Sequence, residues 1–257
     1  MRTIGVIGVG MVGGTLLKWF SKAKAYDKYK EGFQTLNEVV KQDIIFICVW
    51  LDENGRSEKD KETLDEIISQ IPDGKVVVIK STVVPGTTDY FQDKYPQKLF
   101  VFNPEFLTEL TAQYDFEHPC AQILGCTSQS LKVATELMEM LPKSDIRAII
   151  SPKDAEMYKH IRNVYLATKV IIFNQFYDAC ETLGAHYDTL RGIFVQDKWI
   201  AATHTEIWHK GYRGYGGKCL PKETRHLIAE VQGRGGTLPL FEEIEKLNSI
   251  YLNEKIT

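Results

Sequence analysis

Few cysteines, little net charge and short apolar runs restrict the classes to which this chain of 257 residues can belong. Its five cysteines are odd in number and widely spaced, with no Cys-x-x-Cys pair. This usage suits the reducing cytoplasm and argues against a structural zinc site. The longest uninterrupted apolar run covers residues 44–51, which is strand-sized and far below the ~20 residues of a membrane span. The N-terminal residues also lack the pattern of a signal peptide.

The charges nearly cancel, because 31 basic residues face 34 acidic ones and leave a net charge of −3. No global field therefore attracts nucleic acid or a membrane surface, and neither is expected as a partner. Any anionic ligand must be held by a local cluster of residues. Aromatic residues make up 11% of the chain, which excludes disorder as the main state.

The first 150 residues alternate between β-rich runs and stretches with helical spacing. Such alternation predicts an α/β fold with a mostly parallel, doubly wound sheet. The expected strands cover residues 3–7, 43–50, 75–79, 98–102, 122–125 and 146–150, and the expected helices cover residues 13–21, 57–71 and 128–141.

A glycine-rich motif, G-x-G-x-x-G, joins the first expected strand to the first expected helix. It consists of Gly8, Val9, Gly10, Met11, Val12 and Gly13. In this context the first glycine permits a tight turn, the second admits a pyrophosphate and the third allows close helix–strand packing. Asp27 follows Gly8 by 19 residues, close to the offset of the acid that binds the adenosine ribose. The motif and Asp27 together predict binding of NAD rather than NADP. The alternative is that Asp27 is a solvated turn residue.

From residue 151 the pattern becomes helical. Pro152 is well placed as the first residue of a long helix that ends near Leu183, before Gly184. We therefore expect a Rossmann-type NAD-binding domain over residues 1–151. An all-helical domain with a long central helix is expected over residues 152–257.

Three further segments carry distinctive motifs, and a fourth lies on the long helix. They are Ser81-Thr82-Val83-Val84-Pro85-Gly86-Thr87-Thr88, Asn103-Pro104-Glu105-Phe106-Leu107-Thr108-Glu109, Gly214-Tyr215-Gly216-Gly217-Lys218-Cys219-Leu220-Pro221-Lys222-Glu223-Thr224 and residues 155–169. With the N-terminal glycines, these motifs resemble the UDP-glucose/GDP-mannose dehydrogenase family, in that family's order, from residue 1 to about residue 250. The resemblance implies oxidation of the primary alcohol of a nucleotide sugar to a carboxylate, with two NAD⁺ consumed.

A thiolate suits this reaction because the aldehyde between the two oxidations must not escape. Cys219 is the candidate: its addition gives a thiohemiacetal, a second oxidation gives a thioester, and water releases the acid. Pro221 starts a predicted helix there, so the helix dipole and Lys222 favour the thiolate. Alternatively, Cys219 is a small buried packing residue.

The resemblance assigns roles to further residues. Lys159 and Asn163, four apart on the long helix, would stabilise negative charge on the reacting oxygen; otherwise they lie on a solvated helix face. Glu105 and Glu109 would serve water activation and contacts around substrate and nicotinamide, or only mark the start of a helix. The other residues implied are Thr82 and Lys222 near the cofactor, and Phe106, Leu107, Tyr215, Gly216 and Gly217 at the substrate.

Several features depart from the family's pattern. Glu223 stands where the family usually has Asp as a water-activating residue, which keeps the carboxylate but lengthens its reach by one methylene. The segment between residues 27 and 43 is short. The resemblance also implies a third domain, which we do not expect within these 257 residues. A basic group either holds the substrate diphosphate or forms a solvated face; it comprises Lys210, Arg213, Lys218, Lys222 and Arg225.

Two alternative functions follow: a two-electron β-hydroxyacid-type dehydrogenase, and a non-catalytic or partner-dependent subunit that binds NAD and a nucleotide sugar. A homodimer is expected along the long helix, because its apolar residues surround much of its circumference. These residues are Val164, Leu166, Val170, Ile171, Ile172, Phe173 and Phe176.

Overall fold

The computed structural model describes residues 2–51 and 57–254. Their contacts divide the chain into two compact units, and the division falls inside one long helix. The first unit ends at Lys159 and the second begins at His160, about two helical turns beyond the domain change that the sequence predicts. None of the helices in this described part is long and apolar enough to cross a membrane.

The first unit is built on a sheet whose seven described strands lie in the order β2-β1-β3-β4-β5-β6-β7. Every neighbouring pair is parallel except β5 and β6, which confirms the predicted fold class. The strands are β1 (Ile4–Ile7), β2 (Lys24–Tyr26), β3 (Ile44–Ile47), β4 (Val76–Ile79), β5 (Leu99–Phe102), β6 (Gln122–Cys126) and β7 (Arg147–Ile150). The sequence missed β2, which has three residues and buries only Ala25.

Six described helices lie before the long one. They are α1 (Met11–Trp19), α2 (Leu36–Val39), α3 (Ser57–Ile68), α4 (Thr87–Lys94), α5 (Ala112–Glu117) and α6 (Leu131–Met140). The order β2-β1-β3 means that the chain first turns to one side of β1 and then to the other. Ligands of such sheets bind at the carboxyl ends of the strands beside this reversal.

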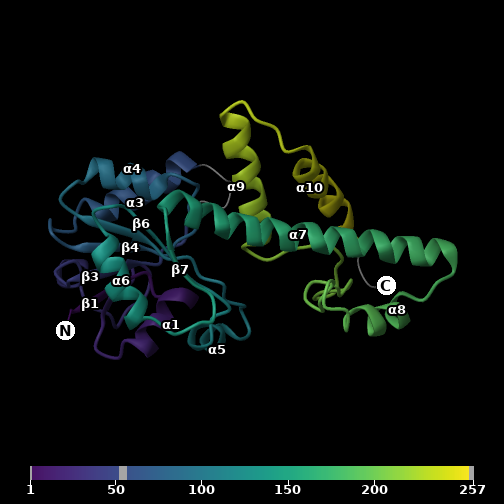
Figure 1. Ribbon diagram of the computed structural model, residues 1–257, viewed down its shortest axis with the longest axis horizontal. Helices are drawn as coiled ribbons and strands as arrows, with labels where there is room; N and C mark the ends of the chain where they lie inside the picture. The colour runs from purple at the N-terminus through teal and green to yellow at the C-terminus, as the bar shows by residue number, and fades with distance from the viewer. Residues whose placement is uncertain (1, 52–56, 255–257) are drawn as a thin grey trace. The chain divides into compact units, whose positions relative to one another are not determined.

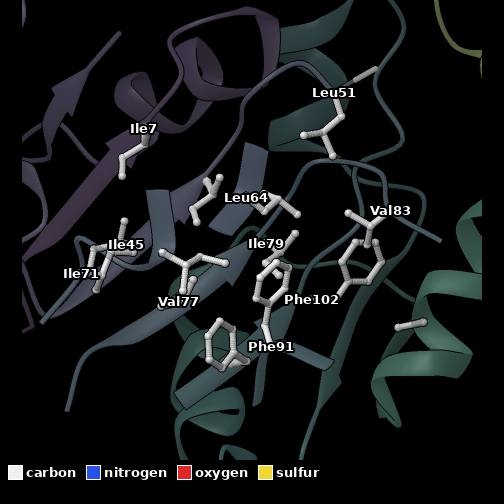
Figure 2. Packing of buried hydrophobic residues seen from close by; sticks show 14 of the residues in the cluster. Ile7, Ile45, Leu51, Leu64, Ile71, Val77, Ile79, Val83, Phe91 and Phe102 are labelled. Atoms are coloured by element: carbon white, nitrogen blue, oxygen red, sulfur yellow. The ribbon is translucent and has the colours of Figure 1, made fainter. Parts of the chain in front are cut away.

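Both faces of the sheet are buried, and alternate residues of each central strand serve opposite faces. Ile45 and Val77 pack on one face with residues of α3 and α4, including Leu64 and Phe91 (Figure 2). Their neighbours in the strands pack on the other face with residues of α1, α5 and α6 (Figure 1). Burial on both sides explains why the strands are continuous apolar runs in the sequence.

The second unit is helical. The long helix α7 (Pro152–Leu183) ends at Gly184, whose φ of +72° suits glycine, so the predicted helix is confirmed. It is followed by α8 (Tyr187–Phe194), α9 (Leu220–Gly233) and α10 (Pro239–Tyr251) (Figure 1). One apolar cluster joins α7 to α10 and to Tyr215, and a second joins α7 to α8.

Residues 152–159 of α7 belong to the first unit, and the buried carboxylate of Glu156 bonds them to its α4. Its oxygens accept hydrogen bonds from the Gly86 N–H (2.6 Å), the Thr88 N–H (2.8 Å) and the Thr88 hydroxyl (2.6 Å). The carboxylate thus lies at the N-terminus of α4, where the helix dipole favours negative charge. Burial nevertheless raises the pKa of Glu156 to about 7, against the opposing effect of these hydrogen bonds.

This raised pKa predicts a pH-dependent stability. Unfolded, Glu156 loses its proton near pH 4.5, so between about pH 4.5 and 7 the folded protein holds a proton that the unfolded chain has released. Stability therefore falls as pH rises through this window. In Glu156→Gln this loss should disappear, so the stability of the wild type relative to the variant should fall by ~1–3 kcal/mol between pH 5 and 7.5. Urea denaturation at several pH values measures it.

The exposed Glu66 on α3 provides the control. Glu66→Gln should follow the wild-type pH dependence throughout. If Glu156→Gln does the same, the carboxylate of Glu156 is not the group that titrates in this range.

Candidate active site

The glycine-rich loop lies between β1 and α1, at the carboxyl end of the sheet. Gly8 has a φ of +89°, and a Cβ there would lie 2.7 Å from the Cys48 carbonyl oxygen. A Cβ on Gly13 would collide with the carbonyl oxygen of Gly8. A Cβ on Gly10, by contrast, would meet nothing within 4 Å. Packing therefore requires glycine at positions 8 and 13, while Gly10 faces open space.

The N-terminus of α1 fits a pyrophosphate. Gly10 is its N-cap, no side chain caps it, and its first turn contains no acidic residue. Its first N–H groups therefore remain suited to an anion. Met11 is 39% exposed and Val12 is half-buried, so the loop can be approached from solvent.

Asp27 follows β2 and lies beside this loop. Its carboxylate accepts hydrogen bonds from the Val9 N–H (2.7 Å) and the Tyr29 N–H (2.9 Å). Lys30 donates to the Val9 carbonyl at 2.6 Å. Asp27 is thus half-buried and bonded to the glycine loop, rather than being a solvated turn residue.

Glu105 and Lys159 form a buried ion pair. The Lys159 ammonium donates to Glu105 Oε1 at 3.0 Å and to the Glu105 carbonyl oxygen at 2.6 Å. Their side chains are 11% and 5% exposed. Burial alone would raise the pKa of Glu105, but Lys159, the Leu107 N–H and Lys80 together outweigh it and hold that pKa below its ordinary value. The Glu105 carboxylate is therefore a charged base inside the protein.

The segment after β5 is irregular from residue 103 to residue 108. Glu105 and Glu109 therefore share no helix face, and the spacing does not mark a helix start: Glu105 is largely buried and Glu109 is exposed. Phe106 packs edge-on against Tyr158, and the Lys159 ammonium lies 5.4 Å from its ring centre. Thr82 is half-buried in the loop that follows β4.

Lys159 and Asn163 lie one turn apart in α7 and are 4% and 7% exposed. This burial excludes the solvated helix face that the sequence left open. Buried polar side chains of this kind are costly unless they have a partner or a role.

Cys219 is the N-cap of α9, and Pro221 lies in the first turn of that helix. Cys219 is exposed, so the alternative of a buried packing residue is wrong. The Glu223 N–H donates to the Cys219 carbonyl at 2.9 Å, which places Glu223 one turn further along. Lys222 and Glu223 are both buried.

The longer side chain of Glu223 has a specific neighbour in the same unit. Its Oε2 lies 3.3 Å from Nδ1 of His160, and both side chains are almost fully buried. The distance is that of an ion pair. His160 thus lies beside Glu223, the position at which the resemblance leads one to expect Asp.

The loop before Cys219 holds its tyrosine inside the unit. Tyr215 is buried, its hydroxyl bonds Glu245, and its backbone exchanges two hydrogen bonds with Asn248. Its ring belongs to the core beside α7 and α10, so the side chain is engaged within the unit. Gly216 and Gly217 follow it, and Gly217 has a φ of +74°.

The basic group does not act as one cluster. Arg213 is buried between the rings of Tyr177 and Tyr251 and pairs with Asp178 and Glu254. Its guanidinium is therefore committed within the unit and is neither a diphosphate ligand nor part of a solvated face. Arg225 pairs with Glu245 at 2.7 Å.

Sequence reasoning missed three polar residues that contact motif segments within their own units: Lys80, Glu156 and His160. Each is buried and lies beside a motif residue in the chain. The available signal was that each is adjacent in sequence to a motif residue: Ser81, Ala155 or Lys159. A motif, however, does not show which distant residue such an adjacent side chain contacts.

Two family models match this chain, and both describe the same family. Residues 16–143 match the model for its NAD binding domain, described as "UDP-glucose/GDP-mannose dehydrogenase family, NAD binding domain". Residues 153–250 match the model for the family's central domain. UDP-glucose 6-dehydrogenase YwqF of Bacillus subtilis is 30% identical over 237 residues, covering 84% of this chain and 51% of its own length. The chain therefore spans about half the length of the curated relatives it matches.

Solved structures share the fold. A UDP-glucose dehydrogenase from Pyrobaculum islandicum has a TM-score of 0.82 at 22% identity, over 97% of this chain and 68% of its own. A 3-hydroxyisobutyrate dehydrogenase from Mycobacterium tuberculosis has a TM-score of 0.72 at 13% identity, over 99% and 96%. With both domain models matched in order, the chain belongs to the UDP-glucose/GDP-mannose dehydrogenase family and carries its NAD-binding domain.

Proposed function

We propose that this protein oxidises the primary alcohol of a nucleotide sugar, of the UDP-glucose type, to the uronic acid and uses two NAD⁺ for each substrate. The observation that carries this proposal is Cys219, an exposed thiol at the N-terminus of α9, within the family's central domain. A two-electron dehydrogenase has no need of such a nucleophile.

Each protein group has a distinct part in this chemistry. NAD⁺, when bound at the glycine-rich loop, accepts the hydride in both oxidations. The Cys219 sulfur adds to the aldehyde carbon, which keeps the intermediate covalently attached until water cleaves the thioester, releases the acid and restores the thiol. Lys159 stabilises negative charge on the reacting oxygen, as does Asn163. Glu105, held ionised by Lys159, and Glu223 are the candidate bases for water.

The site assignments complete this proposal. The cofactor would contact residues 8–13, Asp27, Thr82, Glu109 and Lys222. The sugar nucleotide would contact residues 105–107, Lys159, Asn163 and residues 215–217. The cysteine usage supports the cytoplasm as the location, since none of the five cysteines, all in the described part of the chain, forms a disulfide. The near-neutral charge supports small molecules rather than nucleic acid or a membrane as partners.

A second candidate is a two-electron dehydrogenase of a β-hydroxyacid. The likeness to 3-hydroxyisobutyrate dehydrogenase favours it, because that fold matches nearly the whole of both chains. The amount of NADH formed per nucleotide sugar consumed separates the candidates, with UDP-glucose first in a panel. Two NADH per sugar support the proposal, and one NADH per sugar supports the two-electron reaction. If no sugar of the panel yields NADH, the result supports a subunit that only binds NAD and a nucleotide sugar.

The thiol gives the sharper prediction. Cys219→Ser should abolish net acid formation, because a serine hydroxyl is far less ionised at neutral pH and forms no thioester. Cys219 should react with iodoacetamide faster than Cys120, the other exposed cysteine, since a helix N-terminus favours a thiolate. Peptide mass spectrometry measures both rates. Equal alkylation of the two cysteines, together with full activity of Cys219→Ser, would refute the thiol mechanism.

Asp27 tests the cofactor assignment. Asp27→Ala should weaken NAD⁺ by ~1–3 kcal/mol, because the ribose hydroxyls and the Val9 N–H lose an acceptor. Isothermal titration calorimetry measures this loss. The nearby, exposed Glu31 is a matched control, and Glu31→Ala should bind NAD⁺ as the wild type does. Equal affinity of both variants would remove Asp27 from the site.

We also propose a homodimer built on α7. Of the predicted apolar residues, Val164, Val170, Ile171 and Phe173 are buried. Ile172 and Phe176 remain exposed on α7, as do Ile161, Tyr165 and Leu183, at 45–82% of their surface. These five recur at steps of four and seven residues, which places them on one face of the helix. A second copy packed antiparallel would cover this apolar stripe.

Light scattering at micromolar concentration should give the mass of a dimer. Ile172→Asp with Phe176→Asp should yield a folded monomer, because charges would be buried in the interface. Leu240→Asp, at a comparably exposed position of α10, should remain a dimer. A monomeric wild type would contradict the proposal.

A further inference from the structure

Lys80 is a buried lysine directly after β4, only 4% exposed. Its ammonium donates to Asn103 Oδ1 at 2.8 Å and to the Asn103 carbonyl oxygen at 3.3 Å. Asn103 is fully buried and directly follows β5. One side chain therefore connects the carboxyl ends of two neighbouring strands.

The side-chain amide nitrogen of Asn103 also makes two hydrogen bonds. It donates to Gln122 Oε1 at 3.0 Å and to the Ile123 carbonyl at 2.9 Å, both on β6. Next to Lys80, the Ser81 hydroxyl donates to the Val49 carbonyl at 2.7 Å, just after β3. The 81–88 segment thus leaves the end of β4 from a point bonded to the ends of β3 and β5. The 103–109 segment leaves the end of β5 from a point bonded to the end of β4 and to β6.

The positive charge of Lys80 is unusual in this position. None of the described carboxylates lies within ion-pair distance of it; the titratable groups that face it are Cys48, which directly follows β3, Glu105 and Lys159. Burial lowers the pKa of Lys80 to about 8 and raises that of the Cys48 thiol to about 12, so Cys48 offers no counter-charge at neutral pH. An ammonium buried against neutral acceptors is costly, and Glu105 is the nearby group whose ionisation it favours.

We propose that Lys80 is a positioning residue: it clasps the 81–88 and 103–109 segments together through Asn103 and gives the Glu105 carboxylate a second positive charge besides Lys159. This inference rests on the proposed function, because Thr82 and Glu105 contribute to catalysis only if the site is used as proposed. Lys80 itself is assigned no contact with substrate or cofactor.

Three variants separate the hydrogen bonds of Lys80 to Asn103, which form the clasp, from the effect of its positive charge on Glu105. Lys80→Met keeps the chain length and removes both the N–H donors and the charge. Lys80→Gln keeps an N–H donor for Asn103 without the charge, so it should fold even if Lys80→Met does not. Lys98→Met is the matched control, because Lys98 is equally buried but precedes β5, at the opposite edge of the sheet, where it pairs with Asp73.

Two measurements need no turnover. Amide hydrogen exchange should become faster by about tenfold in both the 81–88 and 103–109 segments of Lys80→Met, and remain near wild type in Lys80→Gln and in Lys98→Met. ¹³C NMR titration of the labelled Glu105 carboxyl should show a raised pKa in both Lys80 variants and an unchanged pKa in Lys98→Met. Unchanged exchange in Lys80→Met, or a change confined to one segment, would overturn the clasp. An unchanged Glu105 pKa in Lys80→Gln would overturn the electrostatic part.

Steady-state kinetics then connect the clasp to the reaction. If the wild type produces NADH from a nucleotide sugar, kcat should fall at least about tenfold in Lys80→Gln, whose loops remain ordered, and stay near wild type in Lys98→Met. Full activity of Lys80→Gln would overturn the positioning role. If the wild type produces no NADH, the proposed function fails, while exchange and the Glu105 titration still decide the clasp.

Discussion

The buried ion pair of Glu105 and Lys159 is the interaction around which the first unit's site is arranged. Two charges withdrawn from water are tolerated only when each satisfies the other and neighbouring groups complete their hydrogen bonds. Here the Leu107 N–H and the Glu105 carbonyl do so. Removing one partner of such a pair costs ~3–5 kcal/mol, because the other remains charged and buried. The irregular segment after β5 and the first turns of α7 therefore hold each other in place.

The parallel sheet explains why these groups meet. β1, β3, β4 and β5 run in the same direction, so their carboxyl ends lie along one edge of the sheet. The glycine loop, the Thr82 loop and the Glu105 segment each begin at this edge. Burial on both faces prevents the strands from slipping in register, since a shift by one residue would exchange the two faces. A rigid sheet thus positions loops that have little regular structure themselves.

Most of the fold could be predicted because the sheet is buried on both faces, which leaves uninterrupted apolar runs such as residues 44–47. β2 was missed because it has only three residues and buries only one of them. The motif residues of the site could also be predicted, but not their partners. Lys159 pairs with a residue 54 positions away and Lys80 with one 23 positions away, and no local pattern encodes such pairs. Tyr215 and Arg213 show the converse: motif position and charge suggested ligand contacts, while tertiary packing uses both side chains within the unit.

The proposed reaction depends most on a covalent role for Cys219. The most direct measurement is the mass of the peptide that carries Cys219, after rapid quenching during turnover with a nucleotide sugar and NAD⁺. Glu223→Gln should lengthen the life of the thioester, because the variant lacks a base one turn from the thiol. We predict a uronyl adduct on Cys219, more abundant in Glu223→Gln than in the wild type. Accumulation of the acid with Cys219 unmodified at every quench time, in both proteins, would contradict the account.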